Sequence, residues 1–244
     1  MLCKLSLSVD FMTKPPLRHI AFIMDGNRRW AEQNTADGLY NEQALRAIFE
    51  AINACKDRDV SCVSLFAFSL ENFSRRDEAL KNHVFKALIQ ACTEKKDLFI
   101  QHGIQATFVG ARECYPVPVL RAVEALEKAT NEQTGVRLQI LFCYGAQQEI
   151  VAATARIACD VASGVLAAED VTPQVFSSYL WTGDMPPPDL IIRTGKVHRL
   201  SNFLLYQAAY SELMFPDCLW PEMTRAKVNE CIDQFYAIER NFGA

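Results

Sequence analysis

Short apolar runs alternate with amphipathic helical patterns along most of this chain, and this alternation restricts the fold more than any other feature. The runs predict strands over 20–24, 62–68, 104–109, 136–143 and 189–192. Helical patterns occupy roughly 41–56, 77–101, 117–131, 147–163 and 224–242. The alternation predicts an α/β fold in which helices wrap a central, mostly parallel sheet.

The chain is long and apolar enough to bury a sizeable core. It has 244 residues, of which 50% are hydrophobic, and this composition argues against a disordered chain. With no repeat or linker in view, we expect an N-terminal extension over 1–18 and a single domain over 19–244. The formal net charge of −4 argues against a general nucleic-acid binder.

The cysteines and the hydropathy pattern predict a cytoplasmic protein. The nine cysteines are odd in number, scattered and without a C-x-x-C pair. Six of them lie within apolar patterns, as expected of core residues in a reducing compartment: Cys55, Cys62, Cys92, Cys143, Cys159 and Cys231. Residues 1–18 lack a signal-peptide pattern, and no run of 18 apolar residues could span a membrane. The four histidines have no metal-site spacing.

Charged residues follow the first predicted strand directly. Asp25-Gly26-Asn27-Arg28-Arg29 comes after the run 20–23 and opens a helix-like stretch. Backbone amides there could bind an anion, and Asp25 would then act through a cation. An ordinary turn with Asp25 as a cap is an equally good interpretation.

A second polar segment follows the strand predicted over 62–68. Ser69 and Asn72 offer neutral hydrogen bonds, and Arg75 offers a two-pronged phosphate contact. Taken alone, this segment is better explained as a helix N-cap with solvated charges.

A third polar segment follows the strand predicted over 189–192. Arg193 and Arg199 flank a loop, Ser201 follows, and together they could hold a diphosphate. Glu212 lies between apolar neighbours and needs a partner. Mg²⁺ shared with Asp25 would satisfy it, and so would a structural salt bridge.

The long apolar stripe over 77–101 has two interpretations. It could form a wall of an apolar tunnel, although most such stripes are simply core.

Together these segments resemble the cis-prenyltransferase family, the undecaprenyl diphosphate synthase-like enzymes. The resemblance covers 19–243 and rests on HIAFIMDGNRRWA, LFAFSLENFSRRDE, CYGAQQEIV, PDLIIRTGKVHRLSNFLLYQAAYSELMFPDCLWPE and IERNFG. It implies a homodimer with an apolar tunnel between helices and sheet. It also implies Mg²⁺-dependent condensation of isopentenyl diphosphate with an allylic diphosphate to form a cis double bond. Contact with a membrane is expected only through the lipid product.

The resemblance assigns a role to each candidate residue. The catalytic residues are Asp25, Asn27 and Asn72. The allylic diphosphate is expected at Gly26, Asn27, Arg28, Arg29 and Arg75. Isopentenyl diphosphate is expected at Ser69, Arg193, Arg199 and Ser201. The metal ligands are Asp25 and Glu212.

The chain departs from the family pattern mainly at the allylic site. Arg28 replaces a glycine, and Asp37 and Asn41 stand where the family has an arginine and a histidine. Gly195-Lys196-Val197 lacks the usual glutamate. Smaller departures are Phe73, Tyr144-Gly145-Ala146-Gln147 and Arg240-Asn241.

Three functions fit this pattern. The first is a working cis-prenyltransferase in which Arg28 and Lys196 supply replacement charge. The second is a variant that makes short or irregular prenyl diphosphates. The third is an inactive family member that acts as a binding subunit. Retention of both proposed metal carboxylates favours an enzyme.

Overall fold

The computed structural model describes residues 17–34, 42–75 and 77–239, and its centre is a six-stranded sheet. All neighbouring strands are parallel, in the order β3-β4-β2-β1-β5-β6. The strands are β1 His19–Ile23, β2 Cys62–Ser69, β3 Ile104–Val109, β4 Val136–Tyr144, β5 Leu190–Arg193 and β6 Glu212–Met214. The predicted α/β fold with a parallel sheet is therefore confirmed.

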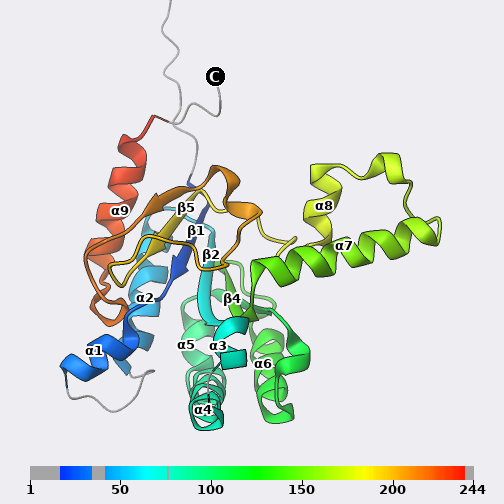
Figure 1. The fold of residues 1–244 in the computed structure, drawn as a ribbon. Coiled ribbons are helices and arrows are strands. Elements are labelled where there is room, and N and C mark those ends of the chain that lie inside the picture. Colours follow the sequence, from blue (N-terminus) through cyan, green and yellow to red (C-terminus); the bar gives the residue numbers. More distant parts are fainter. Residues whose placement is uncertain (1–16, 35–41, 76, 240–244) are drawn as a thin grey trace, which may run out of the picture.

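Helices precede and connect the strands (Figure 1). The α-helices are α1 Asn27–Gln33, α2 Glu42–Asp57, α3 Leu70–Arg75, α4 Glu78–Glu94, α5 Lys96–Gln101, α6 Val117–Thr130, α7 Ala146–Ala162, α8 Pro173–Tyr179 and α9 Arg225–Ala237. Short 3₁₀ turns are η1 Arg112–Cys114, η2 Ala168–Asp170, η3 Gln207–Tyr210 and η4 Trp220–Glu222. In the described part of the chain, no helix is both long enough and apolar enough to cross a membrane.

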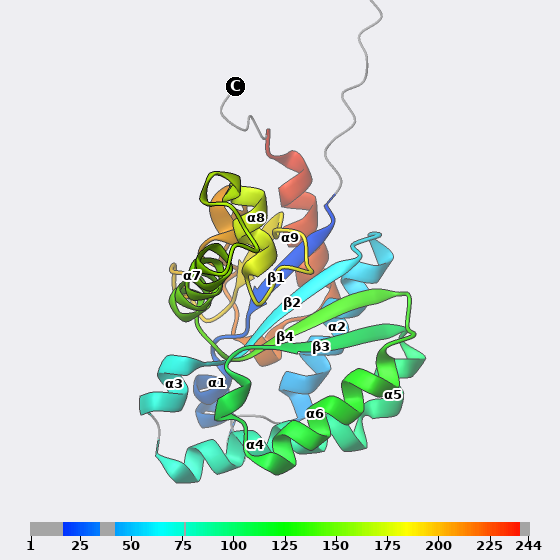
Figure 2. The same cartoon turned by 90° about the vertical axis from the view of Figure 1, so that its right-hand side faces the viewer.

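The two faces of the sheet are covered differently. Successive strand residues point to opposite faces, so Phe22 enters one apolar cluster and Ala21 and Ile23 enter the other. The larger cluster lies under α2, α4, α5 and α6, and α9 packs against α2 (Figure 2). The smaller cluster is closed by Tyr144, by Phe203 and by the loops around them.

The helix predicted over 77–101 is wrong in one respect. It is two helices, because α4 ends at Glu94 and α5 begins at Lys96. Lys95 between them has φ −106° and ψ 6°, which is outside the helical region and turns the chain toward β3. The short elements α8 and β6 were not predicted, and α3 was predicted only as a helix start after the strand over 62–68.

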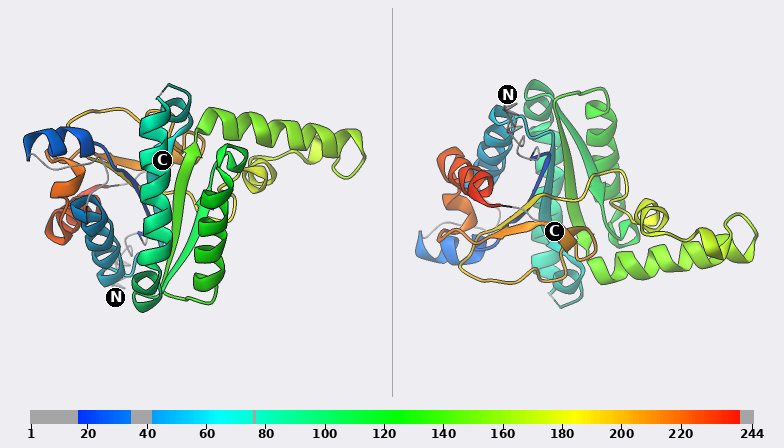
Figure 3. Two further views of the ribbon diagram at one scale, coloured as in Figure 1. Left: turned by 90° about the horizontal axis from the view of Figure 1, so that it is seen from below. Right: turned by 90° about the horizontal axis from the view of Figure 1, so that it is seen from above.

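Helix α7 projects away from the body of the molecule, and α8 lies against it (Figures 1 and 3). Exposed apolar side chains on this projection include Val151, at 67% exposure, and Val165 in the connection that follows. We call α7, α8 and the segment between them the arm.

A buried histidine at the start of β1 predicts a pH-dependent stability. Burial lowers the pKa of His19 to about 4, and its ring contacts the carbonyl oxygen of Pro186 at 2.6 Å and the hydroxyl of Ser64 at 2.9 Å. The unfolded chain binds a proton at His19 near pH 6.5, so this stability is present above pH 6.5 and is lost as the pH falls toward 4.

Between pH 7 and pH 5, we expect His19 to account for a loss of about 2 kcal/mol in the free energy of unfolding. Urea denaturation at both pH values measures this loss. His19→Gln should flatten the pH dependence by that amount, whereas His83→Gln, at an exposed position of α4, should leave it unchanged. Equal pH dependence in wild type and His19→Gln would contradict this assignment.

Candidate active site

The polar segments identified in the sequence meet at the carboxyl ends of neighbouring strands. Asp25 follows β1, Arg193 ends β5, and the sheet register pairs Ile23 with Arg193. Helix α3 begins directly after β2, the neighbour of β1 on its other side. Ligands of open α/β sheets bind at this edge.

Asp25 lies between two arginines. Its Oδ1 accepts a hydrogen bond from Arg29 at 3.2 Å, and its Oδ2 accepts one from Arg193 at 2.8 Å. The Arg193 side chain is only 6% exposed, whereas that of Asp25 is 33% exposed. The carboxylate therefore compensates a nearly buried guanidinium and still faces the open side of the site.

Arg193 also organises the loop that follows β5. Its Nη1 donates to the hydroxyl of Ser201 at 2.8 Å and to the carbonyl oxygen of Arg199. Arg199 itself is exposed. The structure thus brings Asp25, Arg29, Arg193 and Ser201 into one hydrogen-bonded group, with Arg199 at its edge.

Thr194, which no sequence motif indicated, fixes the backbone of Asp25. Its buried hydroxyl accepts from the Asp25 amide at 3.1 Å and donates to the Asp25 carbonyl oxygen at 2.7 Å. The amide of Trp220 donates to the same carbonyl oxygen at 3.0 Å. These residues are far from Asp25 in sequence, so no local pattern indicated the contacts.

Two glycines let the loops approach this group closely. Gly26 has φ +107°, and a Cβ there would lie 2.8 Å from Cδ2 of Leu219. Gly195 has φ +88°, and a Cβ there would lie 2.7 Å from Nη2 of Arg29. Both positions need the left-handed conformation that glycine adopts without strain.

The segment after β2 is arranged as a helix start. The hydroxyl of buried Ser69 accepts the amide of Asn72 at 3.1 Å, which supports the capping interpretation for Ser69. Asn72 and Arg75 are exposed on α3. Asn27, on α1, donates from Nδ2 to the Met24 carbonyl oxygen at 3.1 Å and leaves its buried Oδ1 without a hydrogen bond.

The two candidate replacement cations already have acidic partners. Arg28 is 62% exposed and pairs with Glu32 at 2.8 Å. Lys196 pairs with Asp217 at 2.8 Å, and the pair is exposed. The role of Arg28 at an allylic diphosphate stays a prediction.

Glu212 lies far from Asp25 within the chain. Glu212 is the first residue of β6 and pairs with Leu190, at the amino end of β5. Asp25 lies at the other end, two residues after Ile23, which pairs with Arg193 at the carboxyl end of β5. Within one chain the register therefore places the two carboxylates toward opposite ends of β5, and an Mg²⁺ ion shared between them stays a prediction. Asp37, Asn41 and Arg240-Asn241 lie outside the described residues.

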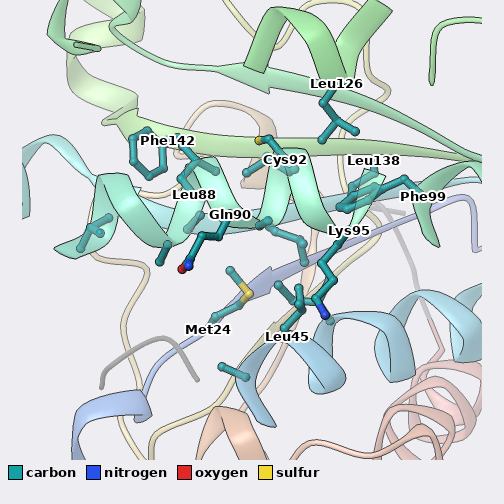
Figure 4. Close-up of a pocket in the computed structure, with 18 of the residues that line it drawn as sticks. Met24, Leu45, Leu88, Gln90, Cys92, Lys95, Phe99, Leu126, Leu138 and Phe142 are labelled. Carbon is teal, nitrogen blue, oxygen red and sulfur yellow. The ribbon is translucent and has the colours of Figure 1, made fainter. Parts of the chain in front are cut away.

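An apolar cavity of about 350 Å³ lies next to this group, between the sheet and the helices α2 and α4. Met24 and Asn27, on either side of Asp25 in sequence, contribute to its wall. Leu88 and Cys92 of α4 face it, which supports the tunnel interpretation of this helix (Figure 4). Exposed Glu42 and Gln90 also line it, so in the described part of the chain the cavity is open to solvent between α2 and α4.

A family model described as "Putative undecaprenyl diphosphate synthase" matches residues 23–243. The chain belongs to the undecaprenyl diphosphate synthase family. It is therefore a cis-prenyltransferase, an enzyme that transfers prenyl groups, as the resemblance in its sequence implies.

Relatives of this cis-prenyltransferase span nearly its whole length. It is 40% identical to an isoprenyl transferase of Agrobacterium fabrum, over 93% of this chain and 92% of the relative. It is 37% identical to a (2E,6E)-farnesyl-diphosphate-specific ditrans,polycis-undecaprenyl-diphosphate synthase of Xanthomonas axonopodis pv. citri, over 93% and 88%. A lavandulyl diphosphate synthase from Lavandula x intermedia, solved with dimethylallyl diphosphate, superposes with a TM-score of 0.87 at 25% identity, over 93% and 98%.

Enzymes of this family generally use Mg²⁺. Asp25 could bind this ion if substrate phosphates supply further ligands. The described residues contain no group of three or more His, Cys, Asp or Glu side chains that could hold a metal. Mg²⁺ commonly takes one or two carboxylates and completes its shell with substrate phosphates and water. Asp25, with the unpaired Oδ1 of Asn27 nearby in sequence, offers oxygen donors of that kind.

Proposed function

We propose that this cis-prenyltransferase condenses isopentenyl diphosphate with an allylic diphosphate in a reaction that requires Mg²⁺. The observation that supports this most directly is the group formed by Asp25, Arg29 and Arg193 at the edge of an apolar cavity. Cations and a metal-binding carboxylate suit diphosphates, and the cavity suits a prenyl chain.

The position of each side chain indicates whether it would bind Mg²⁺, the allylic diphosphate or isopentenyl diphosphate. Asp25 would hold Mg²⁺, which when bound supplies charge that stabilises the departing diphosphate. Arg29 lies on the α1 side of Asp25 and suits the allylic diphosphate, together with Gly26 and Asn27. Arg193, Arg199 and Ser201 suit isopentenyl diphosphate.

In the proposed reaction, the bond between C1 and oxygen of the allylic diphosphate breaks. C4 of isopentenyl diphosphate then bonds to C1, and a proton leaves C2. The positive charge that develops on the allylic carbon lies against an apolar wall, which keeps water from reacting with it.

Incubation with labelled isopentenyl diphosphate and a panel of C5 to C20 allylic diphosphates tests the proposal, with chromatographic sizing and analysis of double-bond geometry. We expect cis-prenyl diphosphates only when Mg²⁺ is present. Branched products from C5 donors alone would instead identify irregular coupling. No transfer from any donor would support the inactive subunit.

We also propose that the arm joins two copies into a homodimer. The arm projects from its own body and exposes apolar side chains (Figure 3). A second copy of this chain would cover them. A cytoplasmic location, with membrane contact only through the lipid product, belongs to the same proposal.

Val151→Glu should dissociate the dimer, because it would bury an unpaired charge in an apolar contact. Sedimentation velocity should show a shift from dimer to monomer. Val117→Glu is a matched control, since Val117 is 61% exposed on α6 and is not part of the arm. A wild type that sediments as a monomer would contradict the proposal, and so would dimers of unchanged stability in Val151→Glu.

A further inference from the structure

Asn202 joins three separate parts of the molecule through one side chain. Its Nδ2 donates to Oε1 of Glu71 on α3 at 2.6 Å and to Oε1 of Gln148 on α7 at 3.1 Å. Its Oδ1 accepts the amide of Gln147 at 2.9 Å, and its carbonyl oxygen accepts the amide of Ala146 at 2.9 Å. The side-chain amide therefore uses both of its donors and its acceptor.

The backbone at this junction is in an uncommon conformation. Ser201 has φ +54° and Asn202 has φ +64°, both in the left-handed region. Asparagine tolerates that region better than most residues, but serine does so less readily, and such conformations persist only where surrounding contacts hold them. The hydrogen bonds of Asn202 are contacts of this kind, directly adjacent to the hydroxyl that Arg193 binds.

The junction is also tightly packed. A Cβ on Gly145 would lie 2.3 Å from Oε1 of Gln148 and 2.8 Å from Nδ2 of Asn202. Glu71 is partly buried, and in the described part of the chain its carboxylate is held by the amide of Asn202 instead of by a cation. A hydrogen bond to a carboxylate is stronger than one between neutral groups.

We propose that Glu71 and Asn202 form a positioning pair that sets the two substrate sites relative to each other. The inference rests on the proposed function, which assigns Ser201 to isopentenyl diphosphate, and on the resemblance, which places Asn72 at the reacting ends and Arg75 at the allylic diphosphate. Glu71 immediately precedes Asn72 on α3, and Asn202 immediately follows Ser201. The pair acts through these neighbours and itself contacts neither substrate.

Exchanging the donor and the acceptor tests the pair. Asn202→Asp places two carboxylates in contact and should raise the KM for isopentenyl diphosphate roughly tenfold or more, with a smaller change in the allylic KM. Glu71→Gln together with Asn202→Asp restores one donor and one acceptor in reverse order, while Asp at 202 still accepts the Gln147 amide. The double variant should return to within about threefold of the wild-type KM.

Controls separate positioning from general damage. Asn131→Asp adds the same charge at an exposed position after α6 and should leave both KM values unchanged. Calorimetric melting of every variant verifies folding, and Glu71→Leu tests the pair if Asn202→Asp fails to fold. Loss of the hydrogen bond in Glu71→Leu should also raise the KM for isopentenyl diphosphate more than the allylic KM.

The results distinguish this inference from the proposed function. An Asn202→Asp variant with unchanged KM, or a folded double variant as impaired as the single one, would overturn the pair. A wild type that forms no prenyl product would overturn the proposed function instead. In that case, calorimetric binding of inorganic pyrophosphate to the same variants still tests the pair, with the same order of affinities expected.

Discussion

Asp25→Ala should lower kcat by about 10²–10³-fold, the scale for removing one electrostatic group that stabilises a transition state. The variant loses the carboxylate proposed for Mg²⁺ and leaves Arg29 and Arg193 without their shared partner. Steady-state kinetics over a range of Mg²⁺ concentrations measures the effect. The dependence of wild-type rate on Mg²⁺ should largely disappear in the variant.

Asp25→Asn and Asp217→Asn are informative companions. The first keeps the shape of the side chain but removes its charge, so it should be nearly as inactive as Asp25→Ala. The second removes an exposed carboxylate that pairs with Lys196 and should leave kcat within about twofold of wild type. Normal turnover of Asp25→Ala in the presence of a chelator would refute the metal role.

Arg193→Leu should impair both isopentenyl diphosphate binding and stability. It removes the proposed diphosphate clamp and the hydrogen bonds to Ser201 and to the Arg199 carbonyl oxygen, so the KM should rise by about 10²-fold. We expect a loss of about 2–3 kcal/mol in the free energy of unfolding. This is below the roughly 3–5 kcal/mol typical of a broken buried pair, because Asp25 keeps Arg29.

Denaturant titration and initial-rate kinetics separate the two effects. Arg193→Lys retains the charge but not the fork of donors, so its KM should fall between those of wild type and Arg193→Leu. Arg225→Leu removes a half-exposed arginine paired with Asp57 and should change the unfolding free energy by less than about 1 kcal/mol. An Arg193→Leu variant with normal affinity for isopentenyl diphosphate would remove this arginine from the site.

The sequence predicted the sheet well because its central strands are buried on both faces. Such strands read as nearly continuous apolar runs, as Ile20 to Ile23 and Leu190 to Ile192 do. Asp25 and Arg193 each come directly after an apolar strand in the sequence, which predicted that both lie at the carboxyl edge of the sheet. The register of β1 and β5 and the hydrogen bond between the two side chains confirm that they meet there. Their catalytic and binding roles stay predictions, as does the boundary of the single domain.

What the sequence could not supply depends on contacts between distant residues. The Thr194 hydroxyl and the Asn202 amide find partners that are far away in the chain, so no local pattern reveals them. The position of Glu212 required the register of β6, a strand of three residues. The break at Lys95 lies inside an apolar stripe whose period continues on both sides.

The cavity open between α2 and α4 has a consequence for product length. A closed cavity limits the product to the length that fills it, but a cavity that is open beside Gln90 in the described part of the chain lets a growing prenyl tail leave sideways. Growth would then stop when release of the product outruns the next condensation. Product length would then depend on the rate of condensation relative to the rate of product release. Longer products should therefore form as the concentration of isopentenyl diphosphate is raised.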